Sequence, residues 1–310
     1  MTITSSTSTS SFYTASAQQL GELQQEVSNI TTQISSGNQL TAASQDPVAA
    51  AQMRMLQLQD SQATTDTASS NKATANLQLA DSAMTSMVND INQARTLTTQ
   101  AANGTLTDAQ RASIGTQLSQ IQSAMLSLAN TRDANGNALF GGGSSGDAYA
   151  LGGTGAVTYQ GNATSLTLPI GGGQTVASSM TGPEVLDMTD AAGNQTNVID
   201  AIGTLASALK AGGAGAQTAA SAGLTTLSNA LDAVTTAQTV IGSRESWIAL
   251  NTQNQTAQST ARATEESHIG DTDVSAAAIK LQELTTALQA SQSCFVRLSS
   301  LSLFNVIGNG

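Results

Sequence analysis

The sequence predicts a mainly α-helical protein: an elongated rod of long antiparallel helices, forming a terminal coiled coil and a helical bundle, with a small β-rich insert domain. Three observations predict this fold. Apolar residues recur at heptad spacing near both ends of the chain. No strong helix breaker occurs over residues 48–102. Glycine and proline gather in the middle of the chain, beside short alternating apolar runs.

Each end of the chain carries a helix with a narrow apolar seam. The apolar residues are spaced three and four apart in turn, which is typical of a coiled coil rather than of a broad globular face. Each such helix needs a partner, so we expect the two seams to pair with each other or with copies of the chain. The seam residues are Leu20, Leu23, Val27, Ile30 and Ile34 near the start, and Leu281, Leu284, Leu288, Phe295 and Leu298 near the end.

A long helix is expected after the first seam. Asp46 can cap its N-terminus, and Pro47 fits the first turn, where its missing N–H is not needed. Asn103-Gly104 is a plausible C-terminal cap. At 1.5 Å per residue this helix would be roughly 80 Å long. Such a helix cannot be buried inside a compact globule, which favours a rod.

Two further helical segments continue the pattern. Thr107 and Gln110 have the spacing of a capping box, which marks the start of a helix. Heptad spacing returns between Leu224 and Ile241. We expect these segments to pack lengthwise with the long helix in one antiparallel bundle, formed by distant parts of the sequence. Residues 210–222, rich in Ala and Gly, could form either a connection or a loose helix.

The middle of the chain differs in kind. Asn135-Gly136 is a hairpin turn signal, and short alternating runs follow at 156–159 and 166–168. The glycine runs 141–143 and 171–173 lack the spacing of a phosphate-binding loop and are interpreted as turns. The predicted domains are a terminal coiled coil (1–44 and 268–310), a helical bundle (45–134 and 191–267) and a β-rich insert (135–190).

Composition excludes several classes of function. The net charge is −11 and only 10% of residues are charged, so the chain offers no basic face for nucleic acid. A single histidine and a single cysteine cannot form a zinc site of the His/Cys kind or an internal disulfide. We expect no membrane span, because the apolar runs are too short. The start of the chain lacks the features of a secretory signal peptide, which by itself would indicate the cytoplasm.

No residue pattern indicates catalysis or a cofactor. His268 lies near Glu265 and Glu266, but this group is interpreted as a solvated helix turn. Cys294, beside the terminal seam, is expected to be a small buried apolar residue. Trp247 is expected in the bundle core. We therefore expect no enzyme activity, no catalytic, cofactor-binding or metal-binding residues, and no cofactor.

Several runs of residues resemble the flagellin superfamily. The run 33–37, followed by 44–50, is similar to the N-terminal signature of that family, and the runs 94–106 and 128–140 resemble its later helical and hairpin passages. Parts of the insert and the C-terminal run 288–304 resemble the branch that joins hook and filament. The positions that match family motifs are Ser35, Ser36, Gly37, Asp46, Pro47, Arg95, Asn103, Gly104, Asn130, Asn135, Gly136 and Phe304.

The resemblance implies a structural role outside the cell. Members of this family leave the cell unfolded, through the flagellar type III apparatus and without a cleaved signal peptide. In the junction branch they form an adaptor layer between hook and filament. The implied partners are copies of the chain in a ring or helical layer, the first hook-associated protein on the hook side, flagellin on the filament side, and an export chaperone.

Two alternatives remain at this point. The chain could be a flagellin-like filament subunit, which grows long polymers instead of a thin layer. It could also be an unrelated secreted coiled-coil protein. Periodicity alone favours neither an internal coiled coil nor an assembly surface for the terminal seams.

Overall fold

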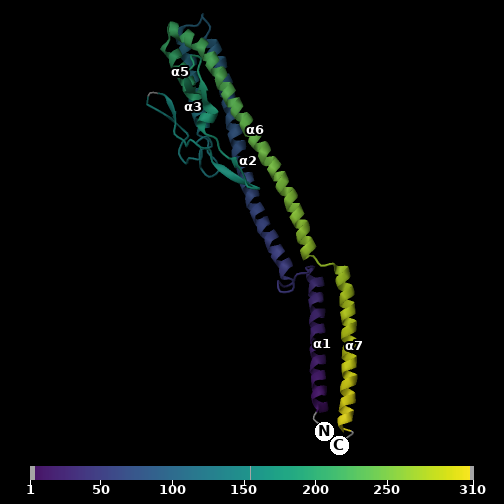
Figure 1. The fold of residues 1–310 in the computed structure, drawn as a ribbon. Coiled ribbons are helices and arrows are strands. Elements are labelled where there is room, and N and C mark those ends of the chain that lie inside the picture. Colours follow the sequence, from purple (N-terminus) through teal and green to yellow (C-terminus); the bar gives the residue numbers. More distant parts are fainter. Residues whose placement is uncertain (1–3, 154, 308–310) are drawn as a thin grey trace. The chain divides into compact units, whose positions relative to one another are not determined.

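The computed structural model describes residues 4–153 and 155–307 (Figure 1). The chain divides into two compact units. Unit 1 contains residues 1–61 and 258–310, and unit 2 contains residues 62–257. The elements in chain order are α1 (Thr4–Ser36), α2 (Pro47–Ala101), α3 (Asp108–Ala129), β1 (Tyr149–Leu151), β2 (Val157–Tyr159), β3 (Thr167–Gly171), β4 (Gln174–Ala177), α4 (Gly182–Leu186), β5 (Asp187–Thr189), β6 (Gln195–Asn197), α5 (Val198–Ala211), α6 (Ala214–Gly270) and α7 (Val274–Ile307).

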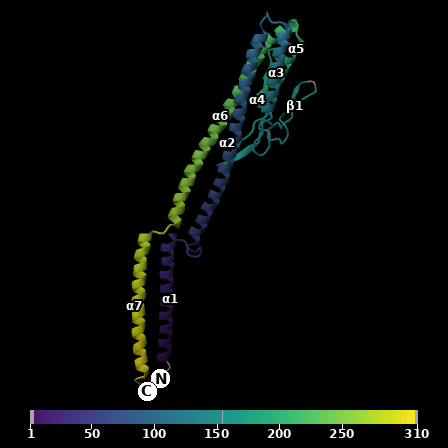
Figure 2. The same ribbon diagram turned by 180° about the vertical axis from the view of Figure 1, so that it is seen from behind.

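The structure confirms the predicted helical fold class. Long helices from opposite ends of the sequence run antiparallel, α1 beside α7 and α2 beside α6, and short two-stranded sheets lie between them in the sequence (Figures 1 and 2). The finer division into three domains stays a prediction.

Local capping explains where two helices begin. The Asp46 carboxylate accepts hydrogen bonds from the backbone N–H of Val48 and Ala49, at 3.0 and 2.9 Å, so it is the N-cap of α2 as predicted. The predicted capping box of Thr107 and Gln110 starts α3. These side chains satisfy backbone donors that have no partner within the helix.

The Ala- and Gly-rich segment 210–222 contains both a connection and a helix. α5 ends at Ala211, and Gly212 and Gly213 follow with φ of 71° and 74°. Only glycine adopts this left-handed backbone without strain, so the pair turns the chain into α6. From Ala214 onward the segment is helical.

The described part of the insert contains three separate antiparallel hairpins. β1 pairs with β2, β3 with β4 and β5 with β6. The middle hairpin has an irregular register between Pro169 and Gly171, and Gly171, Gly172 and Gly173 all have positive φ. This confirms that the second glycine run is a turn. β6 lies wholly beyond Asp190, the predicted end of the insert, so the third hairpin continues past that boundary.

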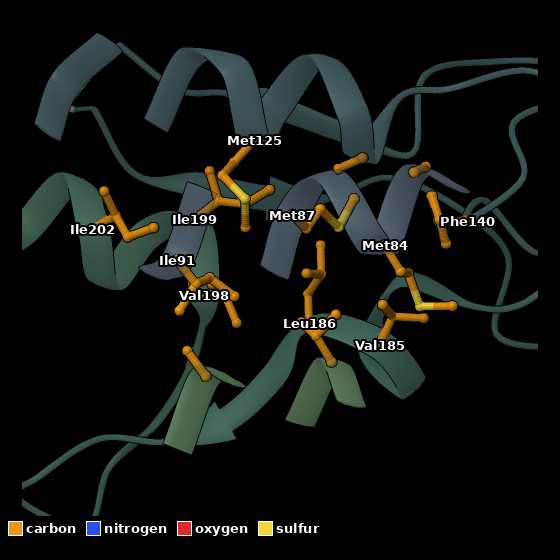
Figure 3. Close-up of a cluster of buried hydrophobic side chains, with 14 of the residues drawn as sticks. Met84, Met87, Ile91, Met125, Phe140, Val185, Leu186, Val198, Ile199 and Ile202 are labelled. Atoms are coloured by element: carbon orange, nitrogen blue, oxygen red, sulfur yellow. The ribbon is translucent and has the colours of Figure 1, made fainter. Parts of the chain in front are cut away.

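The core of unit 2 joins five helices, α2 to α6, with the insert. Side chains from all five converge on one apolar cluster (Figure 3). A buried seam of α2 with residues three and four apart in turn is part of this cluster: Leu77, Ala80, Met84, Met87, Ile91 and Ala94. The labelled members are Met84, Met87, Ile91, Met125, Phe140, Val185, Leu186, Val198, Ile199 and Ile202.

Polar contacts join α2 to α6 in both units. In unit 2 the amide of Gln238 donates to Asp81 at 3.1 Å. In unit 1 the Arg262 guanidinium binds the Asp60 carboxylate at 2.7 Å. Within unit 2, the Thr67 hydroxyl also donates to the side-chain oxygen of Gln255 at 3.4 Å. Residue numbers therefore fall along α6 as they rise along α2 in this unit, as antiparallel helices require.

Candidate assembly interface

The terminal helices α1 and α7 form an antiparallel pair in unit 1. The rings of Tyr13 and Phe295 meet edge to face, with centroids 5.6 Å apart. At the other end of the pair, Asn38 and Asp271 form an isolated antiparallel bridge. Apart from Leu298, the predicted heptad residues lie on the face where the two helices meet, since they are less exposed than their neighbours in the sequence.

The pair leaves much of this seam open. Ala277 and Leu284 are buried, whereas Leu281, Leu288 and Phe295 are only half-buried. The five seam residues of α1, from Leu20 to Ile34, are half-buried as well. The side chains of Leu298 and Phe304 lie outside the described residues. Two helices alone therefore do not cover the apolar face that the sequence provides.

A groove of about 430 Å³ runs along the open side of the pair. Phe12, Leu20 and Leu23 of α1 and Phe295 of α7 supply apolar walls, while glutamates of α1 supply polar ones. Phe12 is exposed over about half of its surface. The groove is concave and accessible, and its lining residues are apolar and polar in equal number.

Cys294 also lines this groove and is exposed, so the expectation of a buried cysteine was wrong. Its position explains the error. Ser291 and Phe295 occupy the less exposed face of α7, and Cys294 lies one residue away from Phe295, about 100° around the helix.

A second apolar stripe lies on the part of α2 that belongs to unit 1. Val48, Met55 and Leu58 are spaced seven and three apart and are each more than 60% exposed. Sequence reasoning missed this stripe, although its heptad spacing was a usable signal. The opposite face of the same helix segment is the one that contains the nearly buried Ala50.

The two helix breaks of unit 1 are bonded to each other. Gly37 ends α1 with φ of 72°, and its N–H donates to Gln33 at 2.8 Å, a left-handed C-terminal cap. The Gly37 carbonyl then accepts from Thr272 at 2.9 Å, and Gln39 donates to Gly270 at 2.7 Å. The positive φ explains why glycine occupies position 37 of the family motif, because no other residue adopts this φ without strain.

Most other motif residues of unit 1 lie next to these helix breaks, whereas Arg95 lies further along α2 in unit 2. The Ser35 hydroxyl donates within α1 to Thr31, and the Ser36 hydroxyl accepts from the N–H of Asn38 at 3.2 Å. Pro47 is the first residue of α2. Arg95 is half-buried on α2.

In unit 2 the motif residues hold turns. Asn103 and Gly104 follow the end of α2, where the buried Arg111 donates to the carbonyls of Ala101 and Asn103 at 3.2 and 3.1 Å. Arg111 thereby fastens the start of α3 to the end of α2. Asn135-Gly136 forms the predicted turn, with φ of 84° at Gly136.

Asp133 organises that turn. Its carboxylate accepts hydrogen bonds from the backbone N–H of Asn135 and Asn137, at 2.8 and 2.9 Å. Burial raises the pKa of this carboxyl, but the hydrogen bonds from Asn137 and Asn135 outweigh burial and hold the pKa below its ordinary value. The turn is therefore most stable when Asp133 is ionised.

The bundle contains one further departure from expectation. Trp247 is 44% exposed, so its expected place in the core was wrong. The neighbouring Ile248 is buried instead, at 3% exposure. Val234, Ile241 and Ile248 are spaced seven apart and share the inner face of α6.

The residues considered for catalysis form no reactive constellation. His268 lines an open groove of unit 1 with Asp271 and Asp273, and Asp273 caps α7 through the N–H groups of Ser275 and Ala276. Within residues 4–153 and 155–307, no three His, Cys, Asp or Glu side chains gather as a metal site requires. None of the described helices is long and apolar enough to cross a bilayer.

Comparison with known proteins matches both helical ends of the chain. Residues 7–145 match the bacterial flagellin N-terminal helical region, and residues 224–307 match the bacterial flagellin C-terminal helical region. The chain is 27% identical to flagellar hook-associated protein 3 of Escherichia coli K12 over 293 residues, covering 88% of this chain and 90% of that protein. It is 26% identical to the Salmonella typhimurium LT2 protein of the same name over 314 residues, covering 96% and 98%.

A solved structure shares the fold. The crystal structure of flagellar hook-associated protein 3 from Legionella pneumophila superposes with a TM-score of 0.65 at 13% identity. The likeness covers 70% of this chain and 98% of that one.

Proposed function

Because this chain belongs to the bacterial flagellin family, we propose that it is a structural subunit of the flagellum that forms the adaptor layer at the junction between hook and filament. The half-covered seam of α1 and α7 is the observation that supports this role most directly. In this role the protein acts outside the cell, and its function is assembly instead of catalysis.

The energetics of the seam favour assembly. Fully burying one large aliphatic or aromatic side chain contributes about 1.5–3 kcal/mol relative to leaving it exposed. Several seam residues are only half-buried in the isolated chain and so gain only part of this free energy: Leu20, Leu23, Leu281, Leu288 and Phe295. Helices from neighbouring subunits can complete the burial, so ordering of the terminal pair is coupled to assembly.

The proposed partners follow from this position in the flagellum. Copies of the chain, arranged in a ring or helical layer, cover the open seams. The first hook-associated protein lies on the hook side and flagellin on the filament side. An export chaperone covers the apolar termini before secretion.

The junction role is favoured over the filament role by the relatives. The Escherichia coli and Salmonella typhimurium proteins, which match over most of the chain, are both named as hook-associated proteins. Family membership also removes the alternative of an unrelated secreted coiled-coil protein. The filament subunit remains as an outcome that experiment can distinguish.

The test is addition of the purified chain to isolated hooks that carry the first hook-associated protein. We expect one layer to form and growth to stop until flagellin is supplied. Leu288→Asp, on the half-buried seam, should abolish binding to the hook end. Gln289→Asp, exposed on the same helix, is the matched control and should bind normally.

Two results would contradict the proposal. Long filaments grown from the chain alone would identify it as a filament subunit. Equal binding by the two variants, with circular dichroism showing both to be equally helical, would show that the seam is not the assembly surface.

A further inference from the structure

The described residues include two Asn-Gly steps in different surroundings. Asn103-Gly104 lies between α2 and α3, and Asn135-Gly136 lies in the turn organised by Asp133. An asparagine followed by glycine can lose its side-chain amide, because the glycine nitrogen carries no bulky neighbour when it attacks the side chain. We propose that the folded protein deamidates at Asn103 while Asn135 is protected, and that the product at position 103 is isoaspartate.

The geometry at Asn103 prepares its side chain for attack. The side-chain carbonyl oxygen Oδ1 accepts hydrogen bonds from the N–H and the hydroxyl of Thr105, at 3.1 and 3.0 Å. Two donors on one carbonyl withdraw electron density from its carbon and stabilise the negative charge that develops on the oxygen. The donors thus act as a small oxyanion hole for Cγ of Asn103.

The attacking nitrogen is also free. The N–H of Gly104 donates no hydrogen bond to any residue in the described part of the chain. Asn103, Gly104 and Thr105 are all exposed, so water reaches the site. No hydrogen bond within the described residues therefore competes with attack of this nitrogen on Cγ.

The opposite holds at Asn135. The N–H of Gly136 donates to the Asp133 carbonyl at 3.0 Å, so the attacking nitrogen is engaged. The side-chain amide of Asn135 donates to the Asp133 carboxylate at 3.4 Å. That negative charge disfavours a second negative charge on the adjacent Asn135 carbonyl oxygen. Both effects slow deamidation at this site.

The reaction balances with water as the only co-reactant. A bond forms between the Gly104 nitrogen and Cγ of Asn103, the bond from Cγ to Nδ2 breaks, and the proton from the glycine nitrogen leaves with the amine as ammonia. The product is a five-membered succinimide. Water then opens the ring at one of its two carbonyls and leaves a carboxylate.

Arg111 selects which carbonyl is opened. Its Nη2 donates to the main-chain carbonyl of Asn103 at 3.1 Å, and its side chain is almost fully buried against that turn. The guanidinium polarises this carbonyl toward water and then pairs with the carboxylate formed there. Opening at the main-chain carbonyl routes the backbone through Cγ, which is isoaspartate.

The new group changes the junction between α2 and α3. Isoaspartate adds a methylene to the backbone between the two helices and a negative charge at the C-terminal end of α2, where the helix dipole disfavours it. The Arg111 pair offsets that charge locally. Ageing of the protein therefore alters this turn while the insert turn at 133–137 stays intact.

The test follows the intact chain in mildly alkaline buffer, with proteolytic peptides analysed by mass spectrometry and electron-transfer fragmentation to separate aspartate from isoaspartate. In the folded protein we expect several-fold more deamidation at Asn103 than at Asn135. The same incubation in urea is the matched arm, where the two sites should react at similar rates.

Two variants test the assigned groups. Thr105→Val removes the hydroxyl donor and should slow the reaction at Asn103 in the folded chain but not in urea. Arg111→Gln should lower the isoaspartate share of the product. Equal rates at the two sites in the folded chain, or faster reaction at Asn135, would overturn the site assignment, and an unchanged isoaspartate share in Arg111→Gln would overturn the role of Arg111.

Discussion

The side-chain amide of Asn130 brackets the backbone of Tyr149. Its Nδ2 donates to the Tyr149 carbonyl at 2.9 Å, and its Oδ1 accepts from the Tyr149 N–H at 2.9 Å. These two hydrogen bonds resemble the pair that two residues exchange in an antiparallel sheet, and they connect the end of α3 to the start of β1. Tyr149 is itself almost fully buried, so this contact positions the first hairpin against the bundle.

Replacing Asn130 should loosen that hairpin. Asn130→Ala removes both bonds and leaves two backbone groups of Tyr149 without them, which should cost about 1–3 kcal/mol. Urea unfolding measures the loss, and hydrogen exchange should place it in β1 and β2. Asn92→Ala, at an exposed site on α2, is the control and should change stability by less than about 0.5 kcal/mol. Equal losses of stability in the two variants would contradict the stabilising role of the Asn130–Tyr149 hydrogen bonds.

The sequence could predict the helix ends but not this contact. Asp46, Thr107 and Gln110 act on groups within four residues, so their roles follow from local spacing. The two Asn130–Tyr149 hydrogen bonds join residues nineteen positions apart. No local sequence pattern around Asn130 indicates that Tyr149 is its partner. The family resemblance identifies Asn130 as a motif position but does not explain why an asparagine is needed there.

The heptad spacing of apolar residues on α6 predicts which of them are buried. Heptad spacing from Val234 and Ile241 leads to Ile248, and the structure buries that residue. Trp247 lies one residue before Ile248, about 100° around the helix, and therefore outside this heptad line. Heptad spacing thus predicts an exposed Trp247, in contrast to the expected core position.

α2 offers a matched pair of leucines, one in its buried seam and one outside it. Leu77 is fully buried and Leu79 is 40% exposed on the same helix. Leu77→Ala should destabilise unit 2 by about 2–5 kcal/mol, because it removes apolar contacts and leaves a cavity. Leu79→Ala should cost well under half as much. Comparable losses in urea unfolding would show that the assigned inner face of α2 is wrong.

The turn around Asp133 should weaken in acid. Its pKa lies below its ordinary value of 3.8 in the folded chain, despite burial, because Asn137 and Asn135 donate to the carboxylate. The stability it contributes is complete above the unfolded-state pKa and is lost as pH falls through the lower folded-state pKa. Asp133→Asn should therefore be less stable than the native chain at neutral pH, and the difference should shrink below about pH 4.

Unfolding of the two chains across this pH range checks the sign. Asp232→Asn, at an exposed site on α6, is the control. A difference between Asp133→Asn and the native chain that grows as the pH falls would contradict the proposed direction.

Cys294 provides a native reporter of assembly. It is exposed in the groove between α1 and α7, so the purified chain should react readily with a maleimide dye. In assembled flagella the groove should be covered and the reaction should slow strongly. Ala192→Cys in a Cys294→Ser background, exposed in the turn between β5 and β6, tests general access. Undiminished labelling of Cys294 in flagella would show that the groove stays open.

The most direct test of the junction role is the fate of flagellin in cells that lack this gene. We predict that such cells keep their hooks and shed flagellin into the medium, and that the intact gene restores filaments. Normal filaments in the deletion strain would contradict the account.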